Sequence, residues 1–584
     1  MVHSSSFPFP TASVRALLAL LVLLLLALRL PAAAQAPAWQ SARAVAVATA
    51  AAANNYSVVT ATAVDAAGNV FLAGIFLNTV ALGGSTLSSL GSYDVFVAKF
   101  NLASNQFVWA QRAGGTGVDY ATALAVSGTS VYVAGNFQSP TAGFGAATLT
   151  NAGDYDGFVA KLVDTGSTGS FAWAQRVGGT GRDFASALAV SGTSMYVAGS
   201  FAGPTAGFGS TTLTSAGAGS SDAFVVKLID AGSTSSFAWA QRAGGPWDDG
   251  ATALAVSGTG VYVAGSFDSP TAGFGSTSLT NADVTTGSAD VFVTKLVDAG
   301  STSSFAWAQR AGGMGDEGAA ALAVSGTNVY ITGAFSSSTV SFGPATLTNA
   351  GSAFSDVFVA KLTDAGSFAW ARPAGGMGRD FASALAVSST SVYVAGSFGS
   401  STAGFGPTTL TNADAMTGTP DAFVTKLTDA GSTGSFAWAQ RAGGTGTDDA
   451  TALALSGTSI YVAGYSNSST VDFGAITLAN QNPNPNSSLG FLASLTDATL
   501  TATTAAAGPR EPAVLFPNPA RRTATLRLPA GMAPAPLTLT DALGRAVRRY
   551  PAPAGPEAAL DLEGVPAGLY LLRGAGPAQR LVVE

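Results

Sequence analysis

The stretch Phe171-Ala172-Trp173-Ala174-Gln175-Arg176 decides the fold, because it recurs along the chain. Copies or close variants of it are centred on Trp109, Trp239, Trp307, Trp370 and Trp438, and a weaker copy surrounds Trp39. Successive copies lie roughly 63 to 70 residues apart, whereas repeats of four strands are commonly about 40 to 50 residues long. Each repeat must therefore hold an element beyond four strands.

Four short apolar runs follow one another within each repeat, and Gly, Ser, Asn or Asp residues bound each run. In the repeat that ends around Trp239 these runs are Ala185–Val190, Met195–Gly199, Phe224–Leu228 and Phe237–Gln241. Runs of this length and composition are typical of β-strands. Between the second and third runs lies Gly207–Thr214, which we expect to form a hairpin-like excursion that accounts for the long repeat.

The order of strand types at the two ends of the series indicates how the repeats are arranged. The second, third and fourth strand types each occur seven times, but the series begins with a fourth strand at Trp39 and ends with a third strand at Phe491. A linear solenoid would leave both as unpaired edges, whereas a ring lets the segment at Trp39 complete the last repeat. The sequence therefore predicts an all-β fold in which residues 37–497 form a seven-bladed β-propeller, with the last blade closed by the N-terminal strand.

The repeated motifs resemble those of a known class. The Trp strand, the Gly-Gly turn, Val-Tyr-Val-Ala-Gly and Asp-Ala-Phe-Val-x-Lys are similar to the SBBP-type β-propeller repeats of bacterial secreted proteins, and the resemblance covers about Pro37 to Asp497. It implies a propeller fold. It implies no particular reaction, because that class shares none and a fold does not by itself confer activity.

The first residues have the pattern of an export signal. Arg15 precedes an apolar run from Ala16 to Leu28, and small residues follow up to Ala34, which predicts a secretory signal peptide over residues 1–34. A retained membrane anchor is the alternative, although the run is short for a helix that spans a bilayer. No other segment of the sequence is long and apolar enough to span one.

Composition excludes many kinds of chemistry. The chain has no Cys, and its single His, His3, lies in the predicted signal peptide. Without them the mature protein cannot hold a Ser-His-Asp or Cys-His nucleophile, a Cys/His zinc site, a c-type haem or a disulfide. The formal net charge of -7 argues against a nucleic-acid partner, which needs a basic face. We therefore predict no catalytic residue, no metal site and no cofactor.

The composition changes after Asp497. Residues 498–511 are rich in Thr and Ala and contain Gly508-Pro509, which is typical of a linker. Residues 512–584 form a second domain with six expected strands, Thr523–Leu528, Pro536–Thr540, Ala546–Tyr550, Ala559–Leu562, Leu569–Arg573 and Gln579–Val583. Short strands separated by turns, such as Asp541–Gly544, predict a small Ig-like β-sandwich.

Three motifs of this domain resemble the type A sorting domain of the Bacteroidota type IX secretion system in order and spacing. They are Phe516-Pro517-Asn518-Pro519, residues 540–545 and residues 566–573. One departure is Arg580, where that family often has Lys. The resemblance implies the type IX secretion machinery as a partner, passage through the periplasm, export to the outer cell surface or medium, and removal of the domain on arrival. An ordinary Ig-like accessory module is the alternative.

An acidic residue occupies one fixed place just before the first strand of six repeats, after a Gly-Gly-x-Gly motif or a close relative of it. These residues are Asp119, Asp183, Asp249, Glu317, Asp380 and Asp448. In a closed ring they would surround one mouth of the central channel, where their negative potential would attract Ca²⁺ or a cationic partner. The alternative is that each carboxylate satisfies the amides of its own turn.

Two further series recur at fixed places around the third strand. Acidic residues precede it at Asp94, Asp156, Asp222, Asp290, Asp356 and Asp421, and lysines follow at Lys99, Lys161, Lys227, Lys295, Lys361 and Lys426. The seventh repeat has neither and offers Leu489 and Ser494. A catalytic residue is needed only once. Because each series occurs six times, we predict that these residues form turns and pair neighbouring repeats.

Trp247 breaks the repetition, since it stands where other repeats have the third Gly of the turn. Its ring is either exposed and able to stack on a sugar, or used to fill a local gap.

These features predict a secreted or cell-surface, non-enzymatic interaction scaffold or adhesin-like protein that binds a glycan or protein ligand. The alternative is a polysaccharide hydrolase or lyase acting through carboxylates, since a glycosidase needs only two. The repeats contain one Glu, Glu317, and their Asp residues are mostly periodic copies, so a unique carboxylate pair is not apparent.

Overall fold

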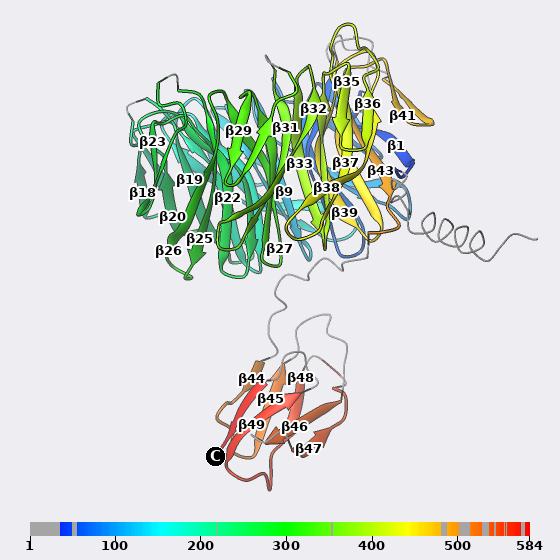
Figure 1. Ribbon diagram of the computed structural model, residues 1–584. Helices are drawn as coiled ribbons and strands as arrows, with labels where there is room; N and C mark the ends of the chain where they lie inside the picture. Colours follow the sequence, from blue (N-terminus) through cyan, green and yellow to red (C-terminus); the bar gives the residue numbers. More distant parts are fainter. Residues whose placement is uncertain are drawn as a thin grey trace, which may run out of the picture. The chain divides into compact units, whose positions relative to one another are not determined.

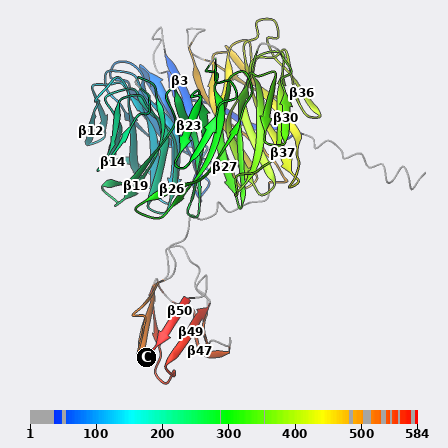
Figure 2. The same ribbon diagram turned by 60° about the vertical axis from the view of Figure 1, so that its left-hand side comes forward.

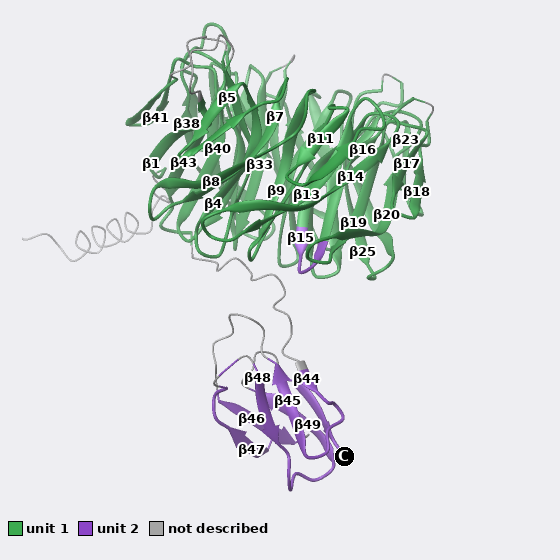
Figure 3. Ribbon diagram, turned by 180° about the vertical axis from the view of Figure 1, so that it is seen from behind, with its two compact units in different colours: residues 1–189, 195–503 green, residues 190–194, 504–584 purple. Residues whose placement is uncertain are grey.

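The computed structural model describes residues 36–48, 55–217, 219–285, 287–351, 354–480, 487–500, 514–527, 536–541, 545–553, 555, 557–573 and 579–584. These residues form antiparallel β-sheets joined by turns and contain no helix, which confirms the all-β prediction (Figure 1, and Figure 2 after a turn of 60°). The chain divides into two compact units, which are Met1–Ala189 with Met195–Thr503 and Thr504–Glu584 with Val190–Ser194 (Figure 3).

Each repeat forms an antiparallel array of four strands, which are hydrogen-bonded in chain order in repeats 1 to 6, whereas in repeat 7 the N-terminal strand takes the fourth place. In repeat 3 they are β15 (Asp183–Ser191), β16 (Ser194–Phe201), β19 (Asp222–Asp230) and β20 (Ser235–Ala243). These strands contain the four predicted runs. The two central strands are buried along almost their whole length, because their apolar side chains are covered on both faces of the sheet.

The other repeats follow the same order within the described residues. Repeat 1 holds β3 (Tyr56–Val64), β4 (Val70–Leu77), β7 (Asp94–Asn101) and β8 (Gln106–Ala113). Repeat 2 holds β9 (Asp119–Ser127), β10 (Ser130–Phe137), β13 (Asp156–Asp164) and β14 (Gly169–Gly179). Repeat 4 holds β21 (Asp249–Ser257), β22 (Gly260–Phe267), β25 (Asp290–Asp298) and β26 (Ser303–Ala311).

The last three repeats are built in the same way. Repeat 5 holds β27 (Glu317–Ser325), β28 (Asn328–Phe335), β31 (Asp356–Thr363) and β32 (Phe368–Gly376). Repeat 6 holds β33 (Asp380–Ser388), β34 (Ser391–Phe398), β37 (Asp421–Asp429) and β38 (Gly434–Ala442). Repeat 7 holds β39 (Asp448–Ser456), β40 (Ser459–Ser466), β43 (Leu489–Thr496) and β1 (Trp39–Val45).

The extra element of each repeat is a two-stranded hairpin, which confirms the predicted excursion. In repeat 3, β17 (Thr205–Phe208) pairs with β18 (Thr211–Thr214). The other hairpins are β5 (Thr79–Leu82) with β6 (Ser85–Ser88), β11 (Thr141–Phe144) with β12 (Ala147–Thr150), β23 (Thr271–Phe274) with β24 (Thr277–Thr280), β29 (Thr339–Phe342) with β30 (Ala345–Thr348), β35 (Thr402–Phe405) with β36 (Thr408–Thr411), and β41 (Thr470–Phe473) with β42 (Ile476–Ala479). Each hairpin pairs with the end of the fourth strand of the preceding sheet, as Gly207 does with Gly178.

The hydrophobic cores of unit 1 lie between neighbouring sheets. One core joins Trp239 of repeat 3 to Phe274 and Phe292 of repeat 4. The hairpin residue Phe274 has its ring centroid 5.0 Å from that of Phe292 and 6.0 Å from that of Phe305. Because a single sheet cannot bury both of its faces, each repeat depends on its neighbours for stability.

The N-terminal strand β1 pairs with β43 of repeat 7, at the place that the fourth strand has in the other repeats. Its continuation β2 (Val47–Ala48) pairs with β5 of repeat 1. The hydroxyl of Thr451 in β39 donates to the carbonyl of Val59 in β3 at 2.5 Å, as Thr122 of repeat 2 does to Ala185 of repeat 3 at 2.6 Å. Repeat 7 therefore contacts repeat 1 through the kinds of bonds that join other neighbours.

The register of β1 corrects the alignment of Trp39 with the repeated Trp. In repeat 2 the third-strand lysine lies opposite Trp173, whereas in repeat 7 the residue at that place, Ser494, lies opposite Ser41. Trp39 instead stands where repeat 2 has Phe171, with its ring centroid 5.1 Å from that of the hairpin Phe. Strand pairing sets the register, and the short N-terminal copy of the motif did not reveal the shift of two positions.

Unit 2 holds two antiparallel sheets over one core. The first contains β44 (Val514–Phe516), β45 (Thr523–Arg527) and β48 (Glu557–Asp561), and the second contains β46 (Leu537–Asp541), β47 (Ala546–Tyr550), β49 (Gly568–Arg573) and β50 (Gln579–Val583). Leu526 and Leu560 of the first sheet are buried in the same core as Leu572 of the second. The six predicted strands are present, and β44 is an additional strand that was too short to stand out next to prolines.

Several predicted segments fall wholly or partly outside the described residues. They are the signal peptide of residues 1–34, residues 501–511 of the linker, residues 512–513 at the start of the second domain, residue 528 at the end of a predicted strand and residues 542–544 of the turn. Within the described residues, no helix has the length and apolar character needed to cross a bilayer.

Candidate functional site

The six acidic residues that begin the first strands are buried in turns. Their exposed fractions are 3 % or less. Each carboxylate accepts a hydrogen bond from the amide four residues earlier, at 2.5 to 2.8 Å. The turn interpretation is therefore confirmed. The alternative interpretation, a ring of carboxylates that attracts Ca²⁺, gains no support, because the six carboxylates are buried and because within the described residues no group of three or more His, Cys, Asp or Glu is placed to hold a metal ion.

The second acidic series lies beside the first. A Cβ on Gly244 would lie 2.3 Å from Oδ1 of Asp222 and 2.8 Å from Oδ2 of Asp249, and the φ of Gly244 is +140°. Only glycine fits between the two carboxyls. Arg242 donates to Asp222 at 3.2 Å within the same repeat. Equivalent pairs are Arg112–Asp94, Arg176–Asp156, Arg310–Asp290 and Arg441–Asp421.

Burial gives these carboxyls unusual proton affinities. It raises the pKa of Asp183, Asp249 and Asp448 to about 6 and that of Glu317 to about 7, although hydrogen bonds from Ser and Gly oppose the shift. The neighbouring acid, such as Asp222 beside Asp249, raises the pKa further. Shifts of this kind occur at catalytic sites, but here the groups are buried and repeated, so the arrangement is structural.

The lysine series joins neighbouring repeats, as predicted. Nζ of Lys161 in repeat 2 lies 2.6 Å from Oδ2 of Asp230 in repeat 3. The hydroxyl of Tyr132 and Nε1 of Trp173, both in repeat 2, donate to the same carboxylate at 2.7 and 3.1 Å. The inter-repeat ion pairs, as we call this set, also include Lys99–Asp164, Lys227–Asp298, Lys295–Asp364, Lys361–Asp429 and Lys426–Asp497.

Hydrogen bonds keep the acceptors of these pairs ionised. Burial alone would raise the pKa of Asp230, but the bonds from Lys161 and Tyr132 outweigh burial and lower it. The same balance lowers the pKa of Asp497 to about 2. The acceptors were missed in the sequence analysis, although an Asp follows the lysine after three residues in repeats 2 to 6. That fixed spacing was the signal that could have found them.

The junction between repeat 7 and repeat 1 lacks the ion pair. Ser494 stands at the place of the lysine, Ser41 at the place of the tryptophan, and Leu102 at the place of the aspartate. The hydroxyls of Ser41 and Ser494 lie 2.7 Å apart. The charged partners on both sides of this one junction are thus replaced together.

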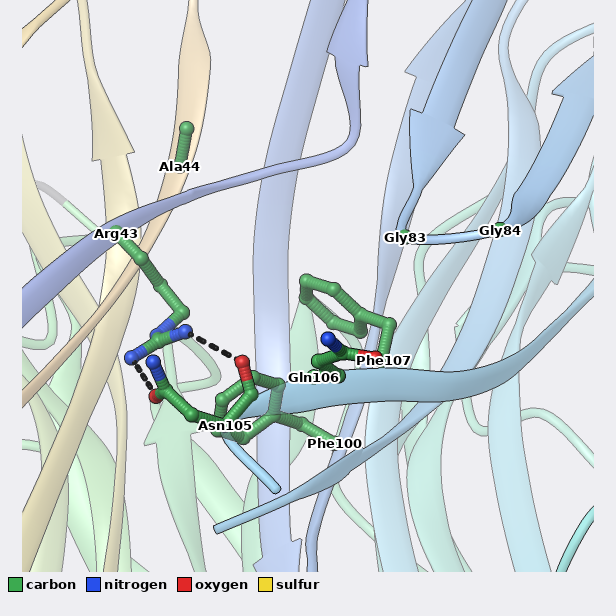
Figure 4. Close-up of a pocket in the computed structure, with 8 residues that line it drawn as sticks. All are labelled: Arg43, Ala44, Gly83, Gly84, Phe100, Asn105, Gln106 and Phe107. Atoms are coloured by element: carbon green, nitrogen blue, oxygen red, sulfur yellow. Dashed lines mark hydrogen bonds between the residues drawn. The ribbon is translucent and has the colours of Figure 1, made fainter. Parts of the chain in front are cut away.

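A pocket of about 380 Å³ opens beside this junction (Figure 4). It is lined by Arg43, Ala44, Gly83, Gly84, Phe100, Asn105, Gln106 and Phe107. Arg43 extends from β1 over the ring of Phe100, with 4.4 Å between Cζ and the ring centroid. Its guanidinium donates to the backbone oxygen of Asn105 at 3.3 Å and to Oδ1 of the same residue. We call this site the β1 pocket.

Trp247 is partly exposed and partly packed against a neighbouring loop. Its side chain is 38 % exposed, and its amide donates to Oγ of Ser269 at 2.9 Å. One side of the ring lies against the backbone of Gly287, where a Cβ would approach Cζ3 to 3.1 Å. The exposed part of the ring keeps its binding role a prediction.

Comparisons with known proteins give little beyond this geometry. No protein-family model and no curated protein matches the chain. One similar solved structure is a provisionally named 6-phosphogluconolactonase from Bacteroides uniformis, with 9% identity, a TM-score of 0.34 and coverage of 66% of this chain and 99% of that one. Another is a protein of unknown function from Dyadobacter fermentans, with 9% identity, a TM-score of 0.31 and coverage of 78% and 99%. Likenesses at this level say nothing about what this chain binds.

Proposed function

We propose that the protein is an exported, non-enzymatic binding protein built on a closed seven-bladed β-propeller. The observation that carries the binding proposal is the contrast between junctions. Six junctions use their charged groups in inter-repeat ion pairs. The junction between repeats 7 and 1 has Ser494 and Leu102 in place of the charged residues and lies beside a pocket with an arginine on its wall. The repeated residues hold neighbouring repeats together, and the junction that lacks them is the candidate binding site.

Closure of the ring is supported by the joint loss of the lysine and the aspartate at the junction between repeats 7 and 1. If repeats 7 and 1 did not meet, loss of the lysine at Ser494 and of the aspartate at Leu102 would be unrelated events. If they do meet, removing one charge alone would leave the other buried without a partner, which is strongly unfavourable. Joint replacement is therefore expected in a ring. The pairing of β1 with β43 and of β2 with β5 supports the same arrangement.

Export through the type IX secretion machinery is supported by the role of one motif residue in unit 2. Asn518 of the Phe-Pro-Asn-Pro motif donates to the carbonyl of Arg580 at 2.7 Å and accepts from the amide of Val582 at 2.9 Å. The motif thereby joins the first part of the domain to its last strand. If the secretion machinery recognises both this motif and the last strand, such a contact would hold the two in one surface.

A carboxylate-dependent polysaccharide hydrolase or lyase remains the competing function, and one experiment separates the two. The purified chain is applied to a glycan and protein array, and the same preparation is incubated with a panel of polysaccharides whose chain length is followed by chromatography. Binding without shortening of any polysaccharide supports the proposal. Shortening of a polysaccharide, or binding to nothing on the array, overturns it.

A further inference from the structure

We infer that the β1 pocket binds small organic carboxylates, and that Arg43 is the residue that holds the carboxylate group. This inference rests on the proposed binding function and adds a ligand class to it. The argument comes from the charge of the pocket, from the residues that other repeats have at the same places, and from the space that the pocket leaves open.

Arg43 is a half-buried cation that has no carboxylate partner among the described residues. The arginines that end the fourth strands of repeats 1 to 4 and 6 each pair with an Asp, whereas Arg43 donates only to the neutral oxygens of Asn105. Burial lowers the pKa of Arg43, because its charge loses water without gaining a counter-charge. An anion that entered the pocket would supply that counter-charge.

Comparison with the other repeats shows that the fold does not require an arginine at this place. By strand register the place is taken by Gln111, Gln175, Gln241, Gln309 and Gln440 in five repeats and by Arg372 in repeat 5. Gln175, for example, donates one bond to the carbonyl of Ser235 in the next repeat, at 3.2 Å. Arg43 makes the same bond to Asn105 and still has N–H donors to spare, since a guanidinium has five.

The spare donors suit a carboxylate group. A guanidinium offers parallel N–H groups that match the two oxygens of a carboxylate, and such paired bonds are strong and directional. Because the ring of Phe100 covers one face of Arg43, the charge is held in one orientation. A pre-oriented donor pair loses little freedom when a ligand binds.

One turn of the pocket wall lacks the side chain that the other repeats have there. The hairpin turn of repeat 1 is Gly83-Gly84, whereas the second residue of this turn is Ala146, Ser210, Ser276, Pro344, Pro407 or Ala475 in the other repeats. A Cβ on Gly84 would meet nothing within 4 Å. Gly84 lines the β1 pocket and leaves free the space that a side chain fills at this turn in the other repeats.

The rest of the pocket suits the body of a small ligand. Phe107 is half-buried, and its ring centroid lies 5.2 Å from that of Phe100. The amide side chains of Asn105 and Gln106 are exposed at the rim. A volume of about 380 Å³ falls in the range of roughly 300 to 1,000 Å³ that is usual for small-molecule sites. An aromatic wall, rim amides and one cation fit a ring-bearing acid.

The test measures binding to the full chain by isothermal titration calorimetry with glucuronic acid, with N-acetylphenylalanine, and with their neutral counterparts glucose and N-acetylphenylalanine amide. We expect at least one acid to bind, and to bind roughly tenfold or more tightly than its neutral counterpart, because a charge-assisted bond is lost in the latter. Comparison of the affinities of the two acids shows whether the pocket prefers a sugar or an apolar ring as the body of the ligand. Equal affinity for acid and neutral forms, or no binding of either acid, overturns the inference.

Variants locate the binding in the pocket. Arg43→Gln introduces the residue that most repeats already carry, so the chain should fold, and affinity for the acid should fall by roughly tenfold or more. Gly84→Ser should weaken binding of both acid and neutral forms by filling space. Arg372→Gln makes the same change at the corresponding place of repeat 5 and should leave affinity unchanged. Unchanged affinity in Arg43→Gln, with the melting temperature of the parent, contradicts the inference.

The outcome distinguishes this inference from the proposed function. A chain that binds a ligand on the array with equal affinity before and after Arg43→Gln keeps the binding function and loses the carboxylate site. A chain that binds nothing on the array but shortens a polysaccharide loses the binding function itself.

Discussion

At the scale of single residues, the same side chain serves opposite electrostatic purposes in this protein. The carboxyl of Asp249 is surrounded by few compensating charges and its pKa rises to about 6. The carboxyl of Asp230 accepts bonds from Lys161, Tyr132 and Trp173, and its pKa falls. Burial is common to both, so the partners decide the sign. The sequence analysis found Asp249 but missed Asp230, whose partners come from a neighbouring repeat.

Removing the acceptor of one inter-repeat ion pair should be costly. In Asp230→Ala, Lys161 remains buried without a counter-charge, and the free energy of unfolding should fall by about 3 to 5 kcal/mol. The matched control is Asp154→Ala, which removes an ion pair with Arg182 whose side chains are 41% and 65% exposed. We expect no detectable change there. Urea denaturation followed by tryptophan fluorescence measures both, and equal midpoints for the two variants would refute the buried role.

Stability should be greatest in mild acid. Groups with a raised pKa, such as Asp183 and Asp448 at about 6, stabilise the folded chain fully below the ordinary pKa of Asp and lose that contribution as pH rises through 6. Asp497, with a pKa of about 2, contributes above the ordinary value and loses its contribution as pH falls toward 2. The melting temperature should therefore rise from pH 8 to pH 5 and fall below pH 4. A melting temperature that increases steadily up to pH 8 would contradict this.

At the scale of elements, the strands and the extra hairpin could be predicted because they repeat. A single apolar run bounded by turn residues could be a strand or part of a buried helix, but the same run in successive copies indicates a strand. The hairpin could be predicted because each repeat is longer than four strands require. The register of β1 could not be predicted, since only cross-strand pairing with β43 places Ser41 rather than Trp39 opposite Ser494. A single divergent copy carries too little pattern to fix a register.

The hairpins should be anchored by their phenylalanines. Phe208 of β17 is 1% exposed, and its ring centroid lies 5.2 Å from that of Phe224 and 5.9 Å from that of Phe237. Phe208→Ala should lower the free energy of unfolding by about 3 to 5 kcal/mol, because removal of a buried Phe ring leaves a cavity in the core. Thr212→Ala, at an exposed position of the same hairpin, should have little effect. A small loss in Phe208→Ala would show that the hairpin adds nothing to the core.

At the scale of the whole molecule, one junction combines two exceptional features. The junction between repeats 7 and 1 lacks the ion pair and also holds the β1 pocket. The residues where the first and last repeats meet therefore differ from those at the other junctions. The sequence showed that Ser494 replaces a lysine, but the meaning of Leu102 required the strand register. The candidate pocket could not be predicted, because its residues come from β1 and from repeat 1.

The C-terminal domain should be required for export. A chain that ends at residue 511, produced in a bacterium with a type IX secretion system, should remain in the periplasm, whereas the full chain should reach the cell surface or medium. Cell fractionation with immunodetection measures the difference. Export of the truncated chain at the level of the full one would refute a sorting role and favour an accessory module.

Closure of the ring by the N-terminal strand is the central claim, and a designed disulfide tests it most directly. The chain has no Cys, and Ser41 and Ser494 lie opposite each other with their hydroxyls 2.7 Å apart, which is close enough for a disulfide. The double variant Ser41→Cys with Ser494→Cys is oxidised, cleaved between the two positions under denaturing conditions and analysed by mass spectrometry without reductant, with each single variant as control. We predict that the terminal fragments stay joined by an intramolecular disulfide in nearly every chain. Free thiols, or disulfides between different chains, would contradict a ring closed by β1.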